Sequence, residues 1–264
     1  MSYPKKFDYY IGIDQTGAAV RDKPKPLYAS IWSNHSHTLY SKIKLSALKP
    51  ETITTLFNDL NLSIGQSKIL ICVDSVLGLP TDCKTSFHAL LRDVKNFKYN
   101  SKNFGLETAY NFYKRYLKNK NTPVRQAELK VGANSVFFKH PFQRNIGCGS
   151  YRVLKELSQD TSWYQVWPFE NQTSTTFTIC EGYPSFFWET WLKTKKRDAQ
   201  FLTQYLVKQK ITQKNIKALT VDEADSIVLA LGAKHVIENK NALNIKLKAD
   251  QKKFEGWILG LTQN

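Results

Sequence analysis

Acidic residues that directly follow apolar runs are the feature that most constrains the fold of this chain. Three acids each come immediately after a run rich in β-branched residues: Asp14, Asp74 and Glu181. Such runs are typical of buried strands, and a carboxylate at the end of one needs a partner, because burying an unpaired charge is costly. The pattern predicts an α/β fold in which the ends of several strands bring these acids together.

A fourth acid, Asp225, lies inside a predicted helix. Thr220 and Glu223 have the spacing of a capping box, which indicates a helix start, and Asp222 suits the positive end of that helix. Asp225 follows Asp222 by three residues and so shares its face, in a helix that is apolar nearly all round. A buried pair of acids at this spacing would be costly without a metal ion.

Each acid also has a structural interpretation. Asp14 is followed by the small-residue turn 15–18 and would suit a turn opening, while Asp74 would suit a loop. Glu181 precedes a predicted helix, where an acid favours the dipole. Taken together, however, carboxylates are the hard ligands that Mg²⁺ and Mn²⁺ prefer, and strand ends hold them rigidly. Asp14, Asp74, Asp222, Asp225 and Glu181 are therefore the candidate metal-binding and catalytic residues.

Hydrophobic periodicity predicts a mixed sheet with flanking helices in a single domain, residues 1–264. Beyond the fourth strand the pattern becomes helical, and we interpret approximately 81–160 as a helical insertion or cap. The predicted strands are 9–14, 27–32, 39–45, 68–74, 163–169 and 175–180. The predicted helices are 51–60, 85–97, 106–119, 184–193, 199–208 and 221–237.

The chain is strongly basic, with 38 Lys and Arg against 22 Asp and Glu and a formal net charge of +16. A field of this size favours phosphate polymers or anionic membrane surfaces. No lipid motif, basic amphipathic terminal helix or membrane-length apolar stretch is present, so we expect a nucleic-acid partner, no membrane and a cytoplasmic location. The four cysteines lack metal-ligand spacing, which argues against zinc.

Two basic segments are candidates for phosphate contacts. Lys114, Arg115 and Lys118 lie on the tyrosine-rich helix, and Lys195, Lys196 and Arg197 form a short cationic run. Interleaved aromatic rings are typical of surfaces that stack on bases. The alternative is that these tyrosines face the core of an ordinary amphipathic helix, with only the cations reaching solvent.

Four segments together resemble a family of predicted RNase H-like nucleases, the domain of unknown function 429, whose members look like relatives of RuvC-type junction resolvases. The segments are Ile11–Asp14, Val73–Pro80, Glu181–Pro184 and Asp222–Ile227, and two further stretches, 167–170 and 255–260, extend the similarity over almost the whole chain. The resemblance implies an RNase H-like fold with metal ligands at Asp14, Asp74, Asp225 and Asp222. Glu181 matches a family acid of less certain role. The turn 15–18 departs from the pattern, since it lacks the extra glycines and arginine of many relatives.

These observations lead to a first hypothesis: a nuclease that uses Mg²⁺ or Mn²⁺ to hydrolyse DNA or RNA, in structured, hybrid or branched form, by a two-metal mechanism. A second hypothesis keeps the fold and charge without the chemistry, as a nucleic-acid-binding protein. A third, an actin-like ATP-dependent phosphotransferase, would need a second lobe for which the chain has neither the length nor a second phosphate turn. A homodimer, which a junction resolvase would require, stays open.

Overall fold

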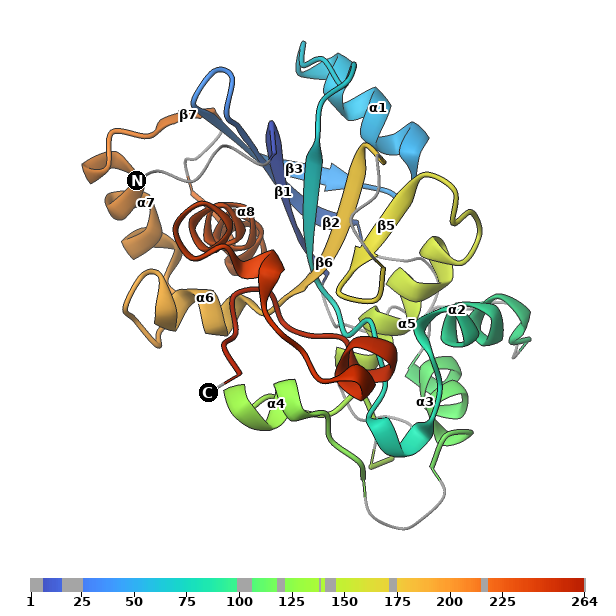
Figure 1. Ribbon diagram of the computed structural model, residues 1–264. Coiled ribbons are helices and arrows are strands. Elements are labelled where there is room, and N and C mark those ends of the chain that lie inside the picture. Colours follow the sequence, from blue (N-terminus) through green and yellow to red (C-terminus); the bar gives the residue numbers. More distant parts are fainter. Residues whose placement is uncertain are drawn as a thin grey trace.

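We describe the fold from a computed structural model of the chain. The structure describes residues 7–15, 26–98, 106–117, 122–137, 139–140, 146–170, 175–214 and 218–263. The architecture is α/β: a mixed sheet lies in the middle, with helices against both of its faces (Figure 1). This confirms the fold class expected from the sequence.

Seven strands form the sheet in the order β5-β6-β4-β1-β2-β3-β7. β1 is antiparallel to β2 and parallel to β4, β4 is parallel to β6, and β6 is parallel to β5. Strands β5, β6, β4 and β1 therefore run in the same direction, and their C-terminal ends lie at the same end of the sheet. The strands are β1 Tyr9–Asp14, β2 Leu27–Ser33, β3 Thr38–Leu45, β4 Ile69–Asp74, β5 Tyr164–Trp167, β6 Phe177–Gly182 and β7 Thr212–Lys214.

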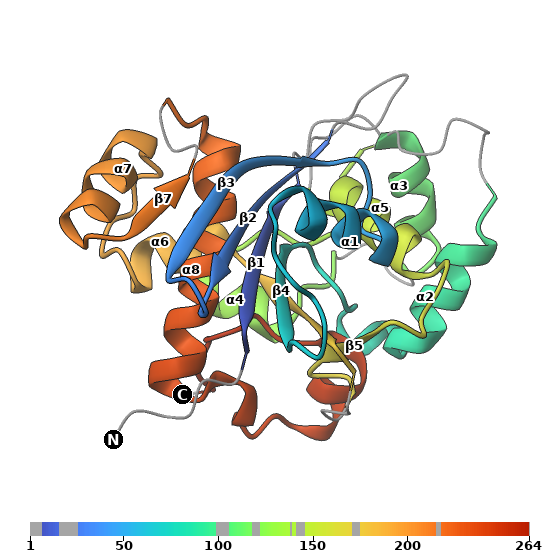
Figure 2. The ribbon, with the colours of Figure 1, turned by 90° about the horizontal axis from the view of Figure 1, so that it is seen from above.

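The helices divide between the two faces, as Figure 2 shows from above. One face packs against α1, α2, α3 and α5, and the other against α6, α7 and α8, so that each face has its own apolar core. The α-helices are α1 Pro50–Asp59, α2 Phe87–Asn96, α3 Leu106–Lys114, α4 Gln126–Val131, α5 Ile146–Leu157, α6 Pro184–Thr190, α7 Ala199–Lys208 and α8 Val221–Lys240. Short helical turns are η1 Thr81–Cys83, η2 Ala242–Asn244 and η3 Gln251–Glu255.

The close approach of α8 to β1 depends on Gly12. A Cβ atom placed on Gly12 would lie 2.0 Å from the backbone oxygen of Ser226 and 2.4 Å from the backbone nitrogen of Ala230. On the neighbouring strand Ser30, which pairs with Gly12, shares a hydrogen bond with the Ser226 hydroxyl at 2.7 Å. A side chain at position 12 would push the helix away, so this glycine sets the depth at which the first turns of α8 sit over the sheet.

Most predicted elements are confirmed, with differences at their ends. Strand β6 continues to Gly182, two residues beyond the predicted end, so Glu181 lies within the strand rather than after it. Helix α5 was not predicted as a separate element, although it is almost entirely buried. Its sequence carries Gly147 and Gly149 in the first turn, which weaken the helical signal and whose small size lets the helix pack closely.

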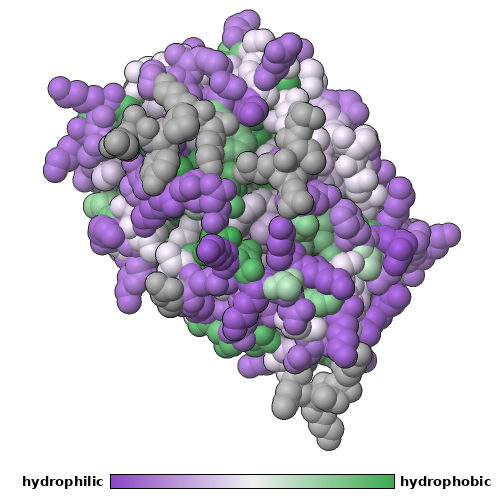
Figure 3. Space-filling model, viewed as in Figure 1, coloured by the Kyte–Doolittle hydropathy of each residue, from purple (hydrophilic) through white to green (hydrophobic). Residues whose placement is uncertain are grey.

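The surface in the direction of Figure 1 is mostly hydrophilic, with small apolar areas between the polar side chains (Figure 3). Among the large apolar side chains that do reach solvent are Leu129 on α4 and Val207 on α7. Within the ranges described above, no helix combines the length and the apolar composition needed to cross a membrane.

Candidate functional site

Asp14 and Asp74 lie side by side at the ends of adjacent parallel strands. Gly12 pairs with Cys72 and Ile13 with Val73, so the next residues along, Asp14 and Asp74, stand at the same level. Side chains alternate between the faces of a strand, and Asp14 therefore points to the same face as Gly12, the face that carries α8. Asp14 is buried, at 4% exposure, and Asp74 is partly buried.

Asp225 reaches this position from the first turns of α8. The predicted capping box is confirmed, because the Glu223 amide donates to the Thr220 hydroxyl at 3.3 Å and the Thr220 amide donates to the Glu223 carboxylate at 2.8 Å. It fixes the start of α8, and Asp225 lies one residue before Ser226, whose backbone contacts Gly12. The acids of β1, β4 and α8 thus meet at one end of the parallel strands.

Both carboxylate oxygens of Asp225 have partners. Trp188 of α6 donates its indole N–H to Oδ1 at 2.6 Å, and Arg197, just before α7, donates from Nη1 to Oδ2 at 2.7 Å. The Asp225 side chain is 2% exposed, whereas that of Arg197 is 46% exposed. Asp222 lies one turn earlier on the same helix and is only partly buried. Trp188 and Arg197 complete an arrangement in which Asp225 is held from two sides.

The electrostatics are those of crowded, desolvated acids. Burial raises the pKa of Asp14 well above its ordinary value, and the neighbouring carboxylates raise it further. Burial likewise raises the pKa of Asp74 to about 7, with the charge of Asp225 the next contribution, while Arg197 and a hydrogen bond with Asp14 oppose the shift. For Asp225 burial also outweighs Arg197, so its pKa is raised too. Within the described part of the chain, the Arg197 guanidinium therefore opposes the repulsion among three acids.

Polar atoms next to these acids are also left unpaired. Gln15 follows Asp14 and is 4% exposed, yet neither end of its carboxamide has a hydrogen-bond partner. Ser75 follows Asp74 and is 1% exposed, and its hydroxyl is likewise unpaired. The Gln15 carboxamide lies against Gly149 of α5, where a Cβ atom would be 1.1 Å from its Oε1, so it points to the face of the sheet opposite Asp14.

The side-chain positions do not form a ready metal centre. Across the residues that the structure describes, no three His, Cys, Asp or Glu side chains are arranged so that they could hold a metal ion. Asp225 does not contribute to such an arrangement because both of its carboxylate oxygens already accept hydrogen bonds. The acids predicted from sequence are thus neighbours, as their mutual repulsion shows, without converging on one point.

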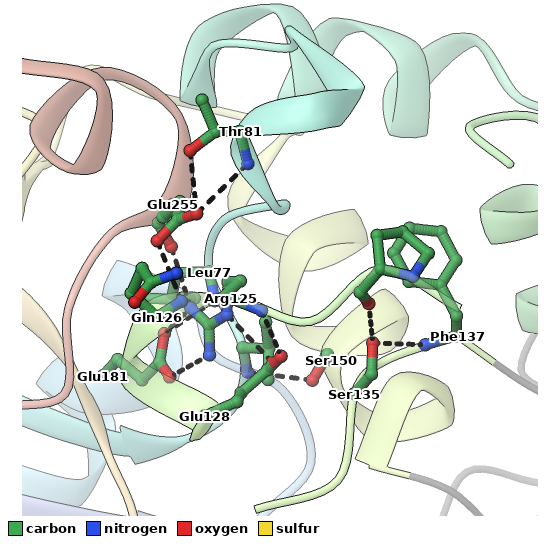
Figure 4. A network of polar contacts seen from close by, with 12 residues as sticks. Leu77, Thr81, Arg125, Gln126, Glu128, Ser135, Phe137, Ser150, Glu181 and Glu255 are labelled. Atoms are coloured by element: carbon green, nitrogen blue, oxygen red, sulfur yellow. Dashed lines mark hydrogen bonds and ion pairs between the residues drawn. The ribbon is translucent and has the colours of Figure 1, made fainter. Parts of the chain in front are cut away.

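Glu181 lies on the opposite face of the sheet from Asp14 and Asp74. It pairs with Val73, one residue before Asp74, and an offset of one residue reverses the face of a strand. Its carboxylate is bonded by the buried guanidinium of Arg125, Nη2 to Oε1 at 2.6 Å and Nη1 to Oε2 at 2.8 Å (Figure 4). It also accepts the Leu77 amide at 3.2 Å, which anchors the loop after Asp74. The structure therefore separates Glu181 from the other candidate ligands and gives it an ion pair.

Arg125 is the centre of a larger buried network that no local sequence pattern predicts. It is 0% exposed and also bonds the Glu128 carboxylate at 2.9 Å and the Glu255 carbonyl at 2.8 Å. Burial alone would lower the pKa of Arg125, but the two carboxylates outweigh it and raise that pKa. The network joins α4, β6 and η3, which are distant in sequence (Figure 4).

The predicted phosphate-binding residues differ in their surroundings. Lys114 and Arg115 are exposed, whereas Phe112 and Tyr113 are buried and Tyr110 and Tyr116 are half-buried against the core, which agrees in part with the alternative reading of this helix. Lys195 and Lys196 are exposed and lie near acidic side chains, 3.6 Å from Glu189 and 3.5 Å from Asp198 respectively. Arg197 alone among them contacts the acidic site. Lys118 lies outside the described residues.

The fold and the site together define an α/β protein whose seven-stranded mixed sheet is consistent with an RNase H-like fold and carries three acids at the ends of adjoining elements. No family model, no curated protein and no solved structure matches this chain.

The raised pKa values predict how stability depends on pH. An Asp whose folded-state pKa exceeds its unfolded value of about 3.9 destabilises the fold as pH rises between the two, because the folded state then holds protons that the unfolded state has released. In chelator, the melting temperature of the wild type should therefore fall between about pH 4 and pH 7 relative to an Asp14→Asn/Asp74→Asn variant. Thermal unfolding at pH 5 and pH 8 measures this; parallel curves would contradict it.

Proposed function

We propose that this protein is a metal-dependent nuclease that hydrolyses phosphodiester bonds of DNA or RNA at the acidic site. The observation that supports it most is the proximity of Asp14, Asp74 and Asp225, from β1, β4 and α8, as buried or partly buried acids with raised pKa values. Acids in such surroundings are common at sites that bind metals or transfer protons. The net charge of +16 suits an anionic polymer as the substrate.

The residues present fit a divalent cation by their chemistry. Three carboxylates supply hard oxygen ligands, and among the residues that the structure describes Arg197 is the guanidinium that lies against them. Their present side-chain positions would have to adjust before an ion could be held. Mg²⁺ or Mn²⁺ would supply activation of water and neutralisation of the charge that develops on the phosphate.

The protein's own residues have distinct roles in this proposal. Asp14, which is more buried than Asp74, would contribute the central ligand, with Asp74 beside it and Asp225 opposite. Asp222 is close enough to raise the pKa of Asp14 and would complete the set. Glu181 would act indirectly, because it anchors the loop that begins after Asp74 and so helps to position that acid. Basic side chains around the site, such as those of Lys195 and Lys196, would face the phosphate backbone.

A second candidate function is nucleic-acid binding without catalysis. The contact between Arg197 and Asp225 favours it, because an acid whose charge is already balanced by a guanidinium can be purely structural. In that case the acids would have a structural role only, and the basic surface would account for all interaction with phosphates. Binding of this kind weakens steeply as the salt concentration rises.

The test is cleavage of labelled single strand, duplex, RNA–DNA hybrid and four-way junction by the purified protein. We expect at least one substrate to be cut with Mg²⁺ or Mn²⁺ and none to be cut in chelator. The same samples, run on a native gel over a series of salt concentrations, report binding. Salt-sensitive binding without cleavage would favour the second candidate, and the absence of both would contradict each of them.

A further inference from the structure

The register of the sheet places a tyrosine and a lysine beside Asp14. Tyr28 of β2 lies directly opposite Asp14 of β1, and Lys44 of β3 lies directly opposite Tyr28. Residues that stand opposite each other in an antiparallel pair point to the same face of the sheet. That face carries α8, because Ser30, two residues along β2 from Tyr28, bonds Ser226 of the helix. Asp14, Tyr28 and Lys44 therefore form a row across three strands that lie side by side (Figure 2).

A β-bulge brings Lys44 into this row. The register between β2 and β3 shifts between Ala29 and Ile31, because β3 contains one extra residue there. In regular pairing Tyr28 would lie opposite Ile43, and the extra residue brings Lys44 to that position instead. Bulges of this kind change the face to which a side chain points and are common next to functional sites.

The ammonium group of Lys44 has an aromatic partner and is open to solvent. Its Nζ atom lies 6.0 Å from the centroid of the Tyr28 ring, at the outer limit of a cation–π contact. Tyr28 is half-buried and Lys44 is exposed. Among the residues that the structure describes, no carboxylate forms an ion pair with Lys44. The ring therefore restricts the side chain, while its charge remains available to an anion from solvent.

We propose that Lys44 contacts a phosphate of the bound nucleic acid and that the Tyr28 ring positions its ammonium group beside the acidic site. The inference rests on the proposed function, of which it uses the nucleic-acid partner and no metal ion. Neighbouring strands are about 4.8 Å apart, so Lys44 stands about 10 Å from Asp14 across the sheet. Acidic side chains repel phosphates, and a cation at this distance offsets the repulsion and holds the nucleic acid across the ends of β1, β2 and β3.

The experiment measures binding of a fluorescein-labelled DNA single strand and of its duplex by fluorescence anisotropy, in chelator, at several salt concentrations. Each phosphate contact adds about 0.7 for a single strand, or about 0.9 for a duplex, to the slope of log affinity against log salt. Lys44→Gln should therefore bind about 3–10-fold more weakly at low salt, with a slope that is shallower by about this amount.

The matched control is Lys68→Gln, which removes the same charge from an exposed position. Lys68 directly precedes β4, whose other end carries Asp74, so it lies at the opposite end of the sheet from the acids. This variant should keep the wild-type affinity and slope. Loss of one positive charge without loss of a phosphate contact is thereby separated from the effect expected at Lys44.

Two variants of Tyr28 test the positioning role of the ring. Tyr28→Phe keeps the ring and should bind as the wild type does. Tyr28→Leu removes it and should lose part of the affinity, although the charge of Lys44 is still present. The melting temperature of each variant, measured in parallel, shows that the comparison is made between folded proteins. Equal binding by Tyr28→Leu and the wild type would contradict the positioning role.

The inference is overturned if Lys44→Gln keeps the wild-type affinity and slope on the probe that the wild type binds. Lys44 would then serve only to protect the edge of the sheet, since it lies beyond the part of β3 that pairs with β7, and Lys44→Gln would show self-association in gel filtration. If the wild type binds neither probe at low salt, the nucleic-acid partner of the proposed function fails, and the inference fails with it.

Discussion

Arg125→Met should lower the free energy of unfolding by about 3–5 kcal/mol, because it leaves buried carboxylates without a counter-charge. Glu181 and Glu128 are 3% and 1% exposed, and each is bonded directly to the lost guanidinium. At about 2–4 °C per kcal/mol for a chain of roughly this size, the melting temperature should fall by about 10 °C. Chemical denaturation followed by circular dichroism measures the change.

Two further variants distinguish charge from packing at this position. Arg92→Met makes the same substitution on the exposed face of α2 and should change stability by no more than about 0.5 kcal/mol. Arg125→Met combined with Glu181→Gln should be more stable than Arg125→Met alone, since a neutral amide needs no counter-charge. If Arg125→Met is no more harmful than Arg92→Met, the buried network has no stabilising role.

Asp14→Asn should reduce the turnover of the proposed nuclease by about 10²–10³-fold or more. Each tenfold loss corresponds to about 1.4 kcal/mol of transition-state stabilisation, and a metal-bound site supplies several kcal/mol. Folding should not suffer, because Asn removes a carboxylate whose charge is opposed by burial and by its neighbours. We therefore expect the melting temperature in chelator at pH 8 to stay the same or rise while activity is lost.

The matched control is Asp59→Asn, the same exchange at an exposed position near the end of α1. It should leave both turnover and melting temperature unchanged. Turnover is measured as the initial rate of cleavage with Mn²⁺ on the substrate found in the panel. If Asp14→Asn keeps more than a tenth of the wild-type rate, Asp14 is not a central metal ligand, whatever its burial.

Strands β1 to β6 were predictable because strand signals are local, whereas the short polar strand β7 was not predicted. β1, β4 and β6 are buried on both faces, and each reads as a continuous apolar run of a length that suits a strand. The start of α8 was equally clear, since a capping box needs only two residues three positions apart. Helix α5 was missed because its glycines give no helical signal, and its burial depends on packing that involves distant parts of the chain.

The candidate site was predictable in part. The neighbourhood of Asp14, Asp74 and Asp225 follows from strand ends and one helix start, which the sequence marks. Glu181 carries the same local mark as Asp14, an acid after an apolar run, yet it points to the other face. The face to which Glu181 points depends on its pairing with Val73 rather than with Asp74. No property of β4 or β6 alone determines that register.

The class of fold, the basic charge and the set of acids at the strand ends follow from the sequence, because they depend on composition and on contacts within a few residues. The partner of each acid depends on tertiary packing. Arg125 and Glu181 are 56 residues apart, and Arg197 and Asp225 are 28 apart. Such pairs form when packing brings distant segments together and buries at least one of the two charges, and no local pattern records that outcome.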